Sequence, residues 1–190
     1  MSERKAELLM MSVALVWGSS YLLMKVGLGG IGPFNLIALR FIMAFLGVTL
    51  IFRRHIRHLT RAVLLKGISV GLLLFMVFTG MVCGVNHTTA SNAGFLTSTS
   101  VVFVPILQSF LKRKLPEKSI MVSILCVVAG LFLVTAKDSI AADLGAAYCL
   151  MGALFYAVYI LVLDKVGKNE DIYMLSMVQL GTVAALGILA

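Results

Sequence analysis

The sequence predicts an all-α fold, a polytopic bundle of about seven membrane-spanning helices. Hydrophobic residues make up 61% of the 190 residues and charged residues only 13%, against about a quarter in soluble domains. The apolar residues form long stretches separated by short polar connections, and a spanning helix needs about 20 mostly apolar residues. We expect spans at residues 8–26, 33–52, 67–85, 92–111, 119–136, 144–163 and 172–190.

The basic residues predict the orientation of these helices. The net charge is +8, and 13 of the 16 Lys and Arg residues fall in alternate connections, whereas the opposite connections contain only Lys25 and Lys137. Cytoplasmic connections carry the excess of Lys and Arg in membrane proteins. We therefore expect a cytoplasmic N-terminus, external connections at 86–91 and 137–143, and an integral protein of the bacterial cytoplasmic (inner) membrane. The same distribution places the basic clusters beside anionic lipid and argues against a nucleic-acid partner.

The first stretch is predicted to be a retained helix. A basic N-terminus before an apolar run is also typical of a signal peptide, but this run has no obvious small-residue cleavage site and six more spans follow it. Trp17, Ser20 and Tyr21 share one face of the helix at spacings of three and four residues. Trp17 lies near mid-span, too deep for an interfacial aromatic belt. We interpret the face as cavity lining, with helix packing as the alternative.

The second stretch contains a solitary charge, Arg40. No Asp or Glu lies inside any expected span to pair with it, and residue counts from the outer helix ends place Arg40 at the depth of Tyr21. An arginine near the middle of a membrane helix costs about 2.5–3.5 kcal/mol on insertion scales. Arg40 is therefore a hydrogen-bonded link between helices, a binding group for a substrate carboxylate or phosphate, or a gating residue.

The third stretch carries two pairs of glycines at small-xxx-small spacing, Gly67 with Gly71 and Gly80 with Gly84. The interval from Gly71 to Gly80 turns a helix through about 180°. Because small residues let helix backbones approach closely in lipid, we expect partner helices on two opposite sides. The basic segment before it, 53–66, is predicted to lie along the membrane surface with its histidines in solvent.

The fourth stretch is unusually polar, with Asn92, Gln108 and four successive hydroxyl residues at 97–100. We expect about half of these hydroxyls to bond back to the backbone of their own helix. Asn92 is a candidate binding residue. Pro105 removes a backbone hydrogen bond and is expected to kink the helix, as a hinge or as a static bend.

The sixth stretch repeats the aromatic pattern of the first, with Tyr148, Tyr156 and Tyr159 on one face. We assign Tyr148, near a helix end, to the aromatic belt, and the two deeper tyrosines to a cavity. The three cysteines all lie in apolar stretches, where cysteine behaves as a small hydrophobe. We therefore expect no disulfide and no metal site.

A shift of 139 positions aligns the first two stretches with the sixth and seventh. It places Trp17 on Tyr156 and Arg40 on Gln179, although the identity in this register is low. We divide the chain into a first five-helix repeat, 1–139, and the first two helices of a second repeat, 140–190. A repeat with an odd number of helices must insert upside down the second time, which gives the inverted-repeat architecture of many secondary transporters.

Several short motifs resemble the EamA family of the drug/metabolite transporter superfamily. The resemblance is carried by Trp17-Gly18-Ser19-Ser20-Tyr21, Pro33, Arg40, Thr88, Ala90, Ala93, Gly94, Pro105, Gly130 and Tyr156-Ala157. It implies ten helices in two inverted five-helix repeats and movement of small metabolites, often outward. By this comparison the chain supplies one repeat and the start of the second, and we expect it to be truncated after the seventh helix.

These features together predict a transmembrane transporter of a small metabolite, an amino acid or a similar amphipathic solute, working by alternating access as an exporter or exchanger. The sequence contains no phosphate loop, metal-ligand spacing or nucleophile with a plausible base, so we expect no enzyme activity and no cofactor. The alternatives are a seven-helix receptor or sensor and a non-transporting membrane partner protein. Expected partners are a small-molecule solute and the lipid bilayer, with a homodimer left open. The candidate substrate-binding residues are Trp17, Ser20, Tyr21, Arg40, Asn92, Tyr156, Tyr159 and Gln179.

Overall fold

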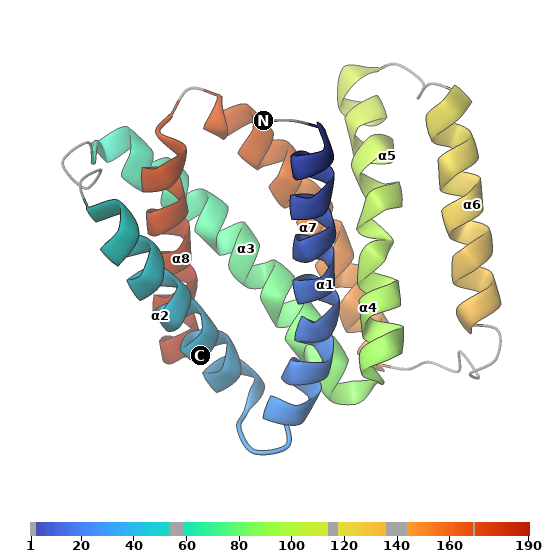
Figure 1. Ribbon diagram of the computed structural model, residues 1–190, viewed down its shortest axis with the longest axis horizontal. Coiled ribbons are helices and arrows are strands. Elements are labelled where there is room, and N and C mark those ends of the chain that lie inside the picture. Colours follow the sequence, from blue (N-terminus) through green and yellow to red (C-terminus); the bar gives the residue numbers. More distant parts are fainter. Residues whose placement is uncertain (1–2, 54–58, 114–117, 136–143, 169) are drawn as a thin grey trace.

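The computed structural model has the all-α fold that the sequence predicts (Figure 1). It describes residues 3–53, 59–113, 118–135, 144–168 and 170–190, and these ranges contain helices but no strand. The helices are α1 (Glu3–Gly27), α2 (Pro33–Phe52), α3 (Arg61–His87), α4 (Ala90–Ser98), α5 (Ser100–Lys112), α6 (Lys118–Thr135), α7 (Leu144–Gly167) and α8 (Ile172–Leu189).

Six helical segments of the described residues are long and apolar enough to cross a membrane, with α4 and α5 forming one segment. The described apolar part of α6, Lys118–Gly130, is shorter. The segments match the expected spans, and several extend beyond them. α3 begins early because Thr60 caps it, with its hydroxyl oxygen accepting a bond of 3.2 Å from the Val63 amide. Part of the predicted surface segment is therefore helix, and its histidines, His55 and His58, lie outside the described residues.

α3 is the central helix, and one of its sides packs closely against α8. A Cβ atom added to Gly67 would lie 2.6 Å from the Val178 side chain, and one added to Gly71 would lie 2.7 Å from Thr182. A larger residue at either glycine would therefore force the helices apart. From the first contact to the second, the residue number rises along both helices, so α3 and α8 run parallel.

The other side of α3 packs against α7 in the same way. A Cβ atom on Gly80 would lie 2.8 Å from the Cα of Gly152, and one on Gly84 would collide with the Cys149 sulfur. From the first contact to the second, the residue number rises along α3 and falls along α7, so these helices are antiparallel. The prediction that the two glycine pairs hold partner helices on opposite sides is confirmed.

The core lies where α2, α3, α7 and α8 meet. Ile37, Val70, Leu175 and Val183 are almost completely buried there. Figure 1 shows α2 and α8 on one side of the bundle, α4 to α6 on the other, and α1 in front of α7. α1 is largely exposed and packs mainly against α4 and α3, while α6 contacts α5 and α4 at the edge of the bundle.

The segment of α4 and α5 is interrupted at Thr99, ahead of the proline that was expected to bend it. The Thr99 hydroxyl donates to the Leu96 carbonyl at 2.6 Å, and its amide bonds the same carbonyl at 3.2 Å. Thr97 and Ser98 also donate to carbonyls of the preceding turn. These bonds confirm that hydroxyls of this stretch turn back on their own helix. The change of hydrogen-bond pattern separates the two helices nearly two turns before Pro105, which lies inside α5.

Lys25, at the end of α1, fixes this helix to the end of α3. Its ammonium donates to the carbonyls of Val85 at 2.8 Å, Thr88 at 2.7 Å and Asn86 at 3.3 Å. These oxygens are at or beside the last turn of α3, where carbonyls lack helical partners and the helix dipole favours a cation. One of the two basic residues that broke the charge pattern is thus a helix cap.

Candidate functional site

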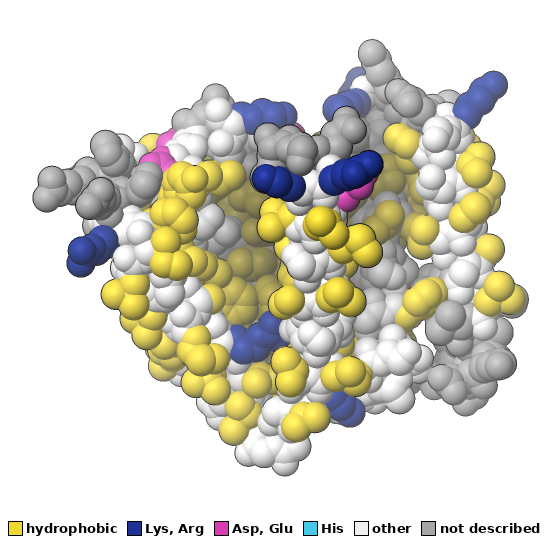
Figure 2. All heavy atoms as spheres, viewed as in Figure 1, with side chains coloured by type: hydrophobic (Ala, Val, Ile, Leu, Met, Phe, Trp, Pro, Cys, Tyr) yellow, Lys and Arg dark blue, Asp and Glu magenta, His cyan; other side chains and the backbone are white. Residues whose placement is uncertain are grey.

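A cavity of about 190 Å³ opens between α1, α2 and α3. Figure 2 shows the molecule hollowed between α2 and α1, with basic side-chain atoms inside the hollow and hydrophobic side chains around it. The lining comes from five residues of α1, one of α2 and two of α3: Val16, Trp17, Ser20, Tyr21, Met24, Arg40, Phe78 and Met81. Four of these were candidate binding residues from the sequence.

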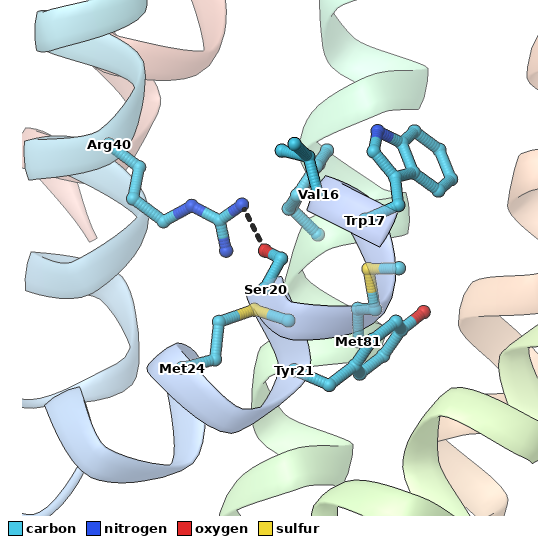
Figure 3. A pocket seen from close by; sticks show the side chains of 8 residues that line it. Val16, Trp17, Ser20, Tyr21, Met24, Arg40 and Met81 are labelled. Atoms are coloured by element: carbon cyan, nitrogen blue, oxygen red, sulfur yellow. Dashed lines mark hydrogen bonds between the residues drawn. The ribbon is translucent and has the colours of Figure 1, made fainter. Parts of the chain in front are cut away.

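Arg40 bridges α1 and α2 across this cavity (Figure 3). Its Nη2 donates to the hydroxyl oxygen of Ser20 at 2.9 Å, and its guanidinium carbon lies 5.6 Å from the centre of the Phe78 ring. Because Ser20 precedes Tyr21, the similar depth inferred from residue counts is confirmed. Nη1 is buried and has no hydrogen-bond partner among the described residues. Arg40 is therefore a link between helices that retains free donor capacity.

Tyr21 and Trp17 lie on the opposite side of the cavity from Arg40 in Figure 3. The Tyr21 hydroxyl lies beside the Thr97 side chain, whose own hydroxyl donates to the Ala93 carbonyl at 2.8 Å. The Tyr21 ring packs on Gly94, where an added Cβ would lie 3.5 Å from it. The α1–α4 contact thus fixes the aromatic side of the cavity, in keeping with the need of a buried tyrosine for a polar partner.

A line of aromatic rings continues from Trp17 into α7 and ends at Gln179 of α8. The centroids of Trp17 and Tyr156 are 5.9 Å apart at an angle of 47°, and those of Tyr156 and Tyr159 are 5.9 Å apart and nearly parallel. The Tyr159 hydroxyl is 3.2 Å from Oε1 of Gln179, and both residues are buried. Trp17 is 49% exposed, so the cavity end of this line is open and the Gln179 end is closed.

Asn92 is set apart from the other candidates. It lies in the first turn of α4, where its backbone N–H donates to the Thr89 hydroxyl oxygen at 3.2 Å, and it does not line the cavity. The candidate list also left out the other four lining residues, Val16, Met24, Phe78 and Met81. Apolar residues in apolar helices look alike in a sequence, and only the packing of α1 and α2 on α3 selects these four.

The chemistry available in the cavity is binding. It offers one cation and two hydroxyl groups among otherwise apolar walls. Among the described residues there is no cluster of three or more His, Cys, Asp or Glu side chains that could hold a metal ion.

Tyr148, expected at the aromatic belt, stacks on His87 at the end of α3, with centroids 6.0 Å apart.

Comparison with known proteins places the chain in a family. The chain is 28% identical over 174 residues to an uncharacterized transporter of Archaeoglobus fulgidus. The aligned residues make up 92% of the chain and 54% of the relative. A second uncharacterized transporter of the same organism is 27% identical over 146 residues, 72% of the chain and 47% of the relative. The chain thus spans about half the length of the curated relatives it matches. No solved structure matches it.

The family model for EamA-like transporters matches residues 4–136, more than half of the chain. The match includes α1 to α6 and therefore the whole lining of the cavity. Together with the apolar helices, it identifies an integral membrane protein. The chain belongs to the EamA-like transporter family.

Proposed function

We propose that this protein transports a small polar or amphipathic solute across the membrane, and that the cavity beside Arg40 is part of the route. The observation that carries the proposal is a mid-span cavity with one cation and two hydroxyls among apolar walls. Polar residues within membrane spans mark substrate and ion pathways because they are expensive to maintain there. The family match and the transporter relatives support the same function.

The mechanism we propose is alternating access by two inverted repeats, with the boundary near residue 139. Its support is the packing of α2 against α8, the two helices that the shift of 139 makes equivalent. Gly187 packs against Ala38, and Val48 packs against the cluster that contains Met177. The residue number rises along α2 and falls along α8 from one contact to the other, so the two helices are antiparallel. Equivalent helices of inverted repeats have this opposite orientation.

The proposed orientation has the N-terminus and the basic connections on the cytoplasmic side. Lys66 at the start of α3 forms an ion pair of 2.6 Å with Glu170 in the connection between α7 and α8. Both residues belong to connections that the charge pattern assigns to the cytoplasm. The contact is consistent with this assignment, because it brings the two connections together at one end of the bundle.

A cavity-filling substitution tests the route. The chain is reconstituted in liposomes, and exchange of a panel of labelled amino acids and organic acids is measured for the wild type, Ser20→Trp and Ser19→Trp. Ser20 lines the cavity, whereas its neighbour Ser19 is exposed on α1 and does not. We expect the wild type and Ser19→Trp to exchange at least one solute, and Ser20→Trp to be blocked. Full exchange by folded Ser20→Trp would exclude this cavity, and no exchange by the wild type would exclude transport by this chain.

A further inference from the structure

We propose that the cavity binds an organic monocarboxylate in preference to a zwitterion, a cation or a neutral solute. The carboxylate is placed on the free side of the Arg40 guanidinium and the apolar body extends toward Trp17. This inference rests on the proposed function, since it names the class of solute for the same cavity.

The first argument is the donor geometry at Arg40. A guanidinium has five N–H donors in a fixed planar fork and no acceptor. The bond from Nη2 to Ser20 and the Phe78 ring fix its position, whereas Nη1 is buried without a partner in the described structure. A buried, charged donor without an acceptor is costly. A carboxylate oxygen satisfies it, and charge-assisted bonds of this type are the strong ones.

The second argument is the charge balance. The lining contains no Asp or Glu, and the acidic residues of the sequence all lie near span ends or in connections. The ion pairs of the described residues, Lys66 with Glu170 and Lys168 with Asp164, are also at helix ends. Arg40 therefore has no internal counterion, and one bound negative charge neutralises the cavity. A second negative charge would have no partner.

The third argument concerns the ammonium group of an amino acid. The lining contains no carboxylate, and its side-chain oxygens are only the hydroxyls of Ser20 and Tyr21. The Ser20 hydroxyl already accepts a hydrogen bond from Arg40, and Tyr21 lies beside Thr97. An ammonium group would enter beside Arg40 without a carboxylate to pair with, and like charges in a low-dielectric site repel. The cavity thus disfavours the zwitterion that the sequence analysis allowed.

The apolar walls specify the rest of the ligand. Arg40 lies on one side of the cavity, while Trp17 and Tyr21 lie on the other, with Met81 beside them (Figure 3). This separation of a charged end from an aromatic end matches an amphipathic acid with an aromatic or branched aliphatic body. Ligand sites commonly combine apolar walls with a few polar groups that fix orientation.

Trp17 makes the proposal directly measurable, because it is the sole tryptophan of the chain and lines the cavity. The purified chain in lipid nanodiscs is titrated with 3-phenylpropionate and with its amide, with phenylalanine and with 3-phenylpropylamine, while Trp17 emission is recorded. 4-Methylpentanoate, its amide and leucine form a second, aliphatic series. We expect saturable binding of a carboxylate, with the matched amide, amino acid and amine at least about tenfold weaker.

Substitutions of Arg40 locate the effect. Arg40→Gln removes the charge and is expected to weaken carboxylate binding at least about tenfold while leaving amide binding unchanged. Arg40→Lys should recover only part of the affinity, because it lacks the fork. Arg61→Gln, at an exposed arginine at the start of α3, is the control and should bind as the wild type does.

The outcomes separate this inference from the proposed function. Equal affinity for a carboxylate and its amide, or no binding of either series, overturns the monocarboxylate class, and this comparison needs no variant. Unchanged carboxylate affinity in folded Arg40→Gln overturns the role of Arg40. Either result leaves transport through the cavity standing if Ser20→Trp still blocks exchange. The proposed function fails separately, if the cavity-filling variant exchanges solute normally.

Discussion

Gly80 of α3 and Gly152 of α7 meet at a backbone crossing so close that a Cβ atom on Gly80 would lie 2.8 Å from the Gly152 Cα. The carbonyl of Tyr148 would lie at the same distance from that Cβ. Neither neighbour can rotate away, because both are backbone atoms. This crossing attaches the first repeat to the beginning of the proposed second one.

The first prediction is that Gly80→Ala destabilises the bundle. The added methyl group forces α3 and α7 apart, and overpacking of this kind costs about 1–3 kcal/mol. Thermal unfolding of the purified chain in detergent should show a lowered midpoint. Gly130→Ala on α6 is the matched control, because nothing lies within 4 Å of a Cβ at Gly130. An equal midpoint for the two variants would show that the α3–α7 crossing is looser than described.

The second prediction concerns the cap that Lys25 places on α3. Lys25→Met keeps the length of the side chain but removes its three donors to the carbonyls at the end of α3. Because the ammonium is partly in contact with solvent, we expect a loss of only about 1 kcal/mol in the free energy of unfolding. Lys118→Met, at an exposed lysine at the start of α6, should unfold like the wild type. Equal stability of both variants would show that the cap contributes nothing.

The third prediction is the topology. In a background without native cysteines, Ser91→Cys on the proposed external side should react with a membrane-impermeant maleimide added to intact cells. Arg61→Cys on the proposed cytoplasmic side should react only after the cells are opened. Both positions are exposed in the structure, so a failure to label cannot be ascribed to burial. The reverse pattern would overturn the orientation that the basic residues indicate.

The sequence predicted the local features of the fold well. Span positions follow from hydropathy, and the glycine pairs of α3 follow from helical periodicity, because both depend on neighbours within a few turns. The similar depth of Arg40 and Tyr21 in the membrane also followed from residue counts alone. These properties are encoded in single helices, so they can be read before any packing is known.

Features that depend on packing could not be predicted in the same way. The cap by Lys25 joins residues 60 and more positions apart, and nothing local marks those carbonyls as its partners. The helix interruption at Thr99, where the hydroxyl and the backbone amide of this residue both bond the Leu96 carbonyl, was not predicted. Asn92 was chosen for its polarity alone, and the structure places it away from the cavity lining.

The fourth prediction concerns the buried pair of Tyr159 and Gln179, which ends the aromatic line from Trp17. Tyr159→Phe removes the hydroxyl group that donates to Gln179. It leaves the Gln179 amide oxygen buried without this hydrogen bond, at a cost of about 1–3 kcal/mol. Gln179→Leu removes the amide instead. The double variant should be more stable than the sum of the two losses implies, because it removes both partners together. Chemical unfolding of the wild type, both single variants and the double variant measures this coupling free energy.

The same pair distinguishes a structural contact from a binding contact. Tyr159 is only 9% exposed and Gln179 8%, and neither lines the cavity. We therefore expect Tyr159→Phe to lower stability without changing the affinity of the Trp17 site for a carboxylate. Tyr21→Phe, within the lining, provides the comparison, because it removes a hydroxyl group of the cavity itself. A large affinity change in Tyr159→Phe, with unfolding unaffected, would move Tyr159 and Gln179 from the supporting structure into the binding site itself.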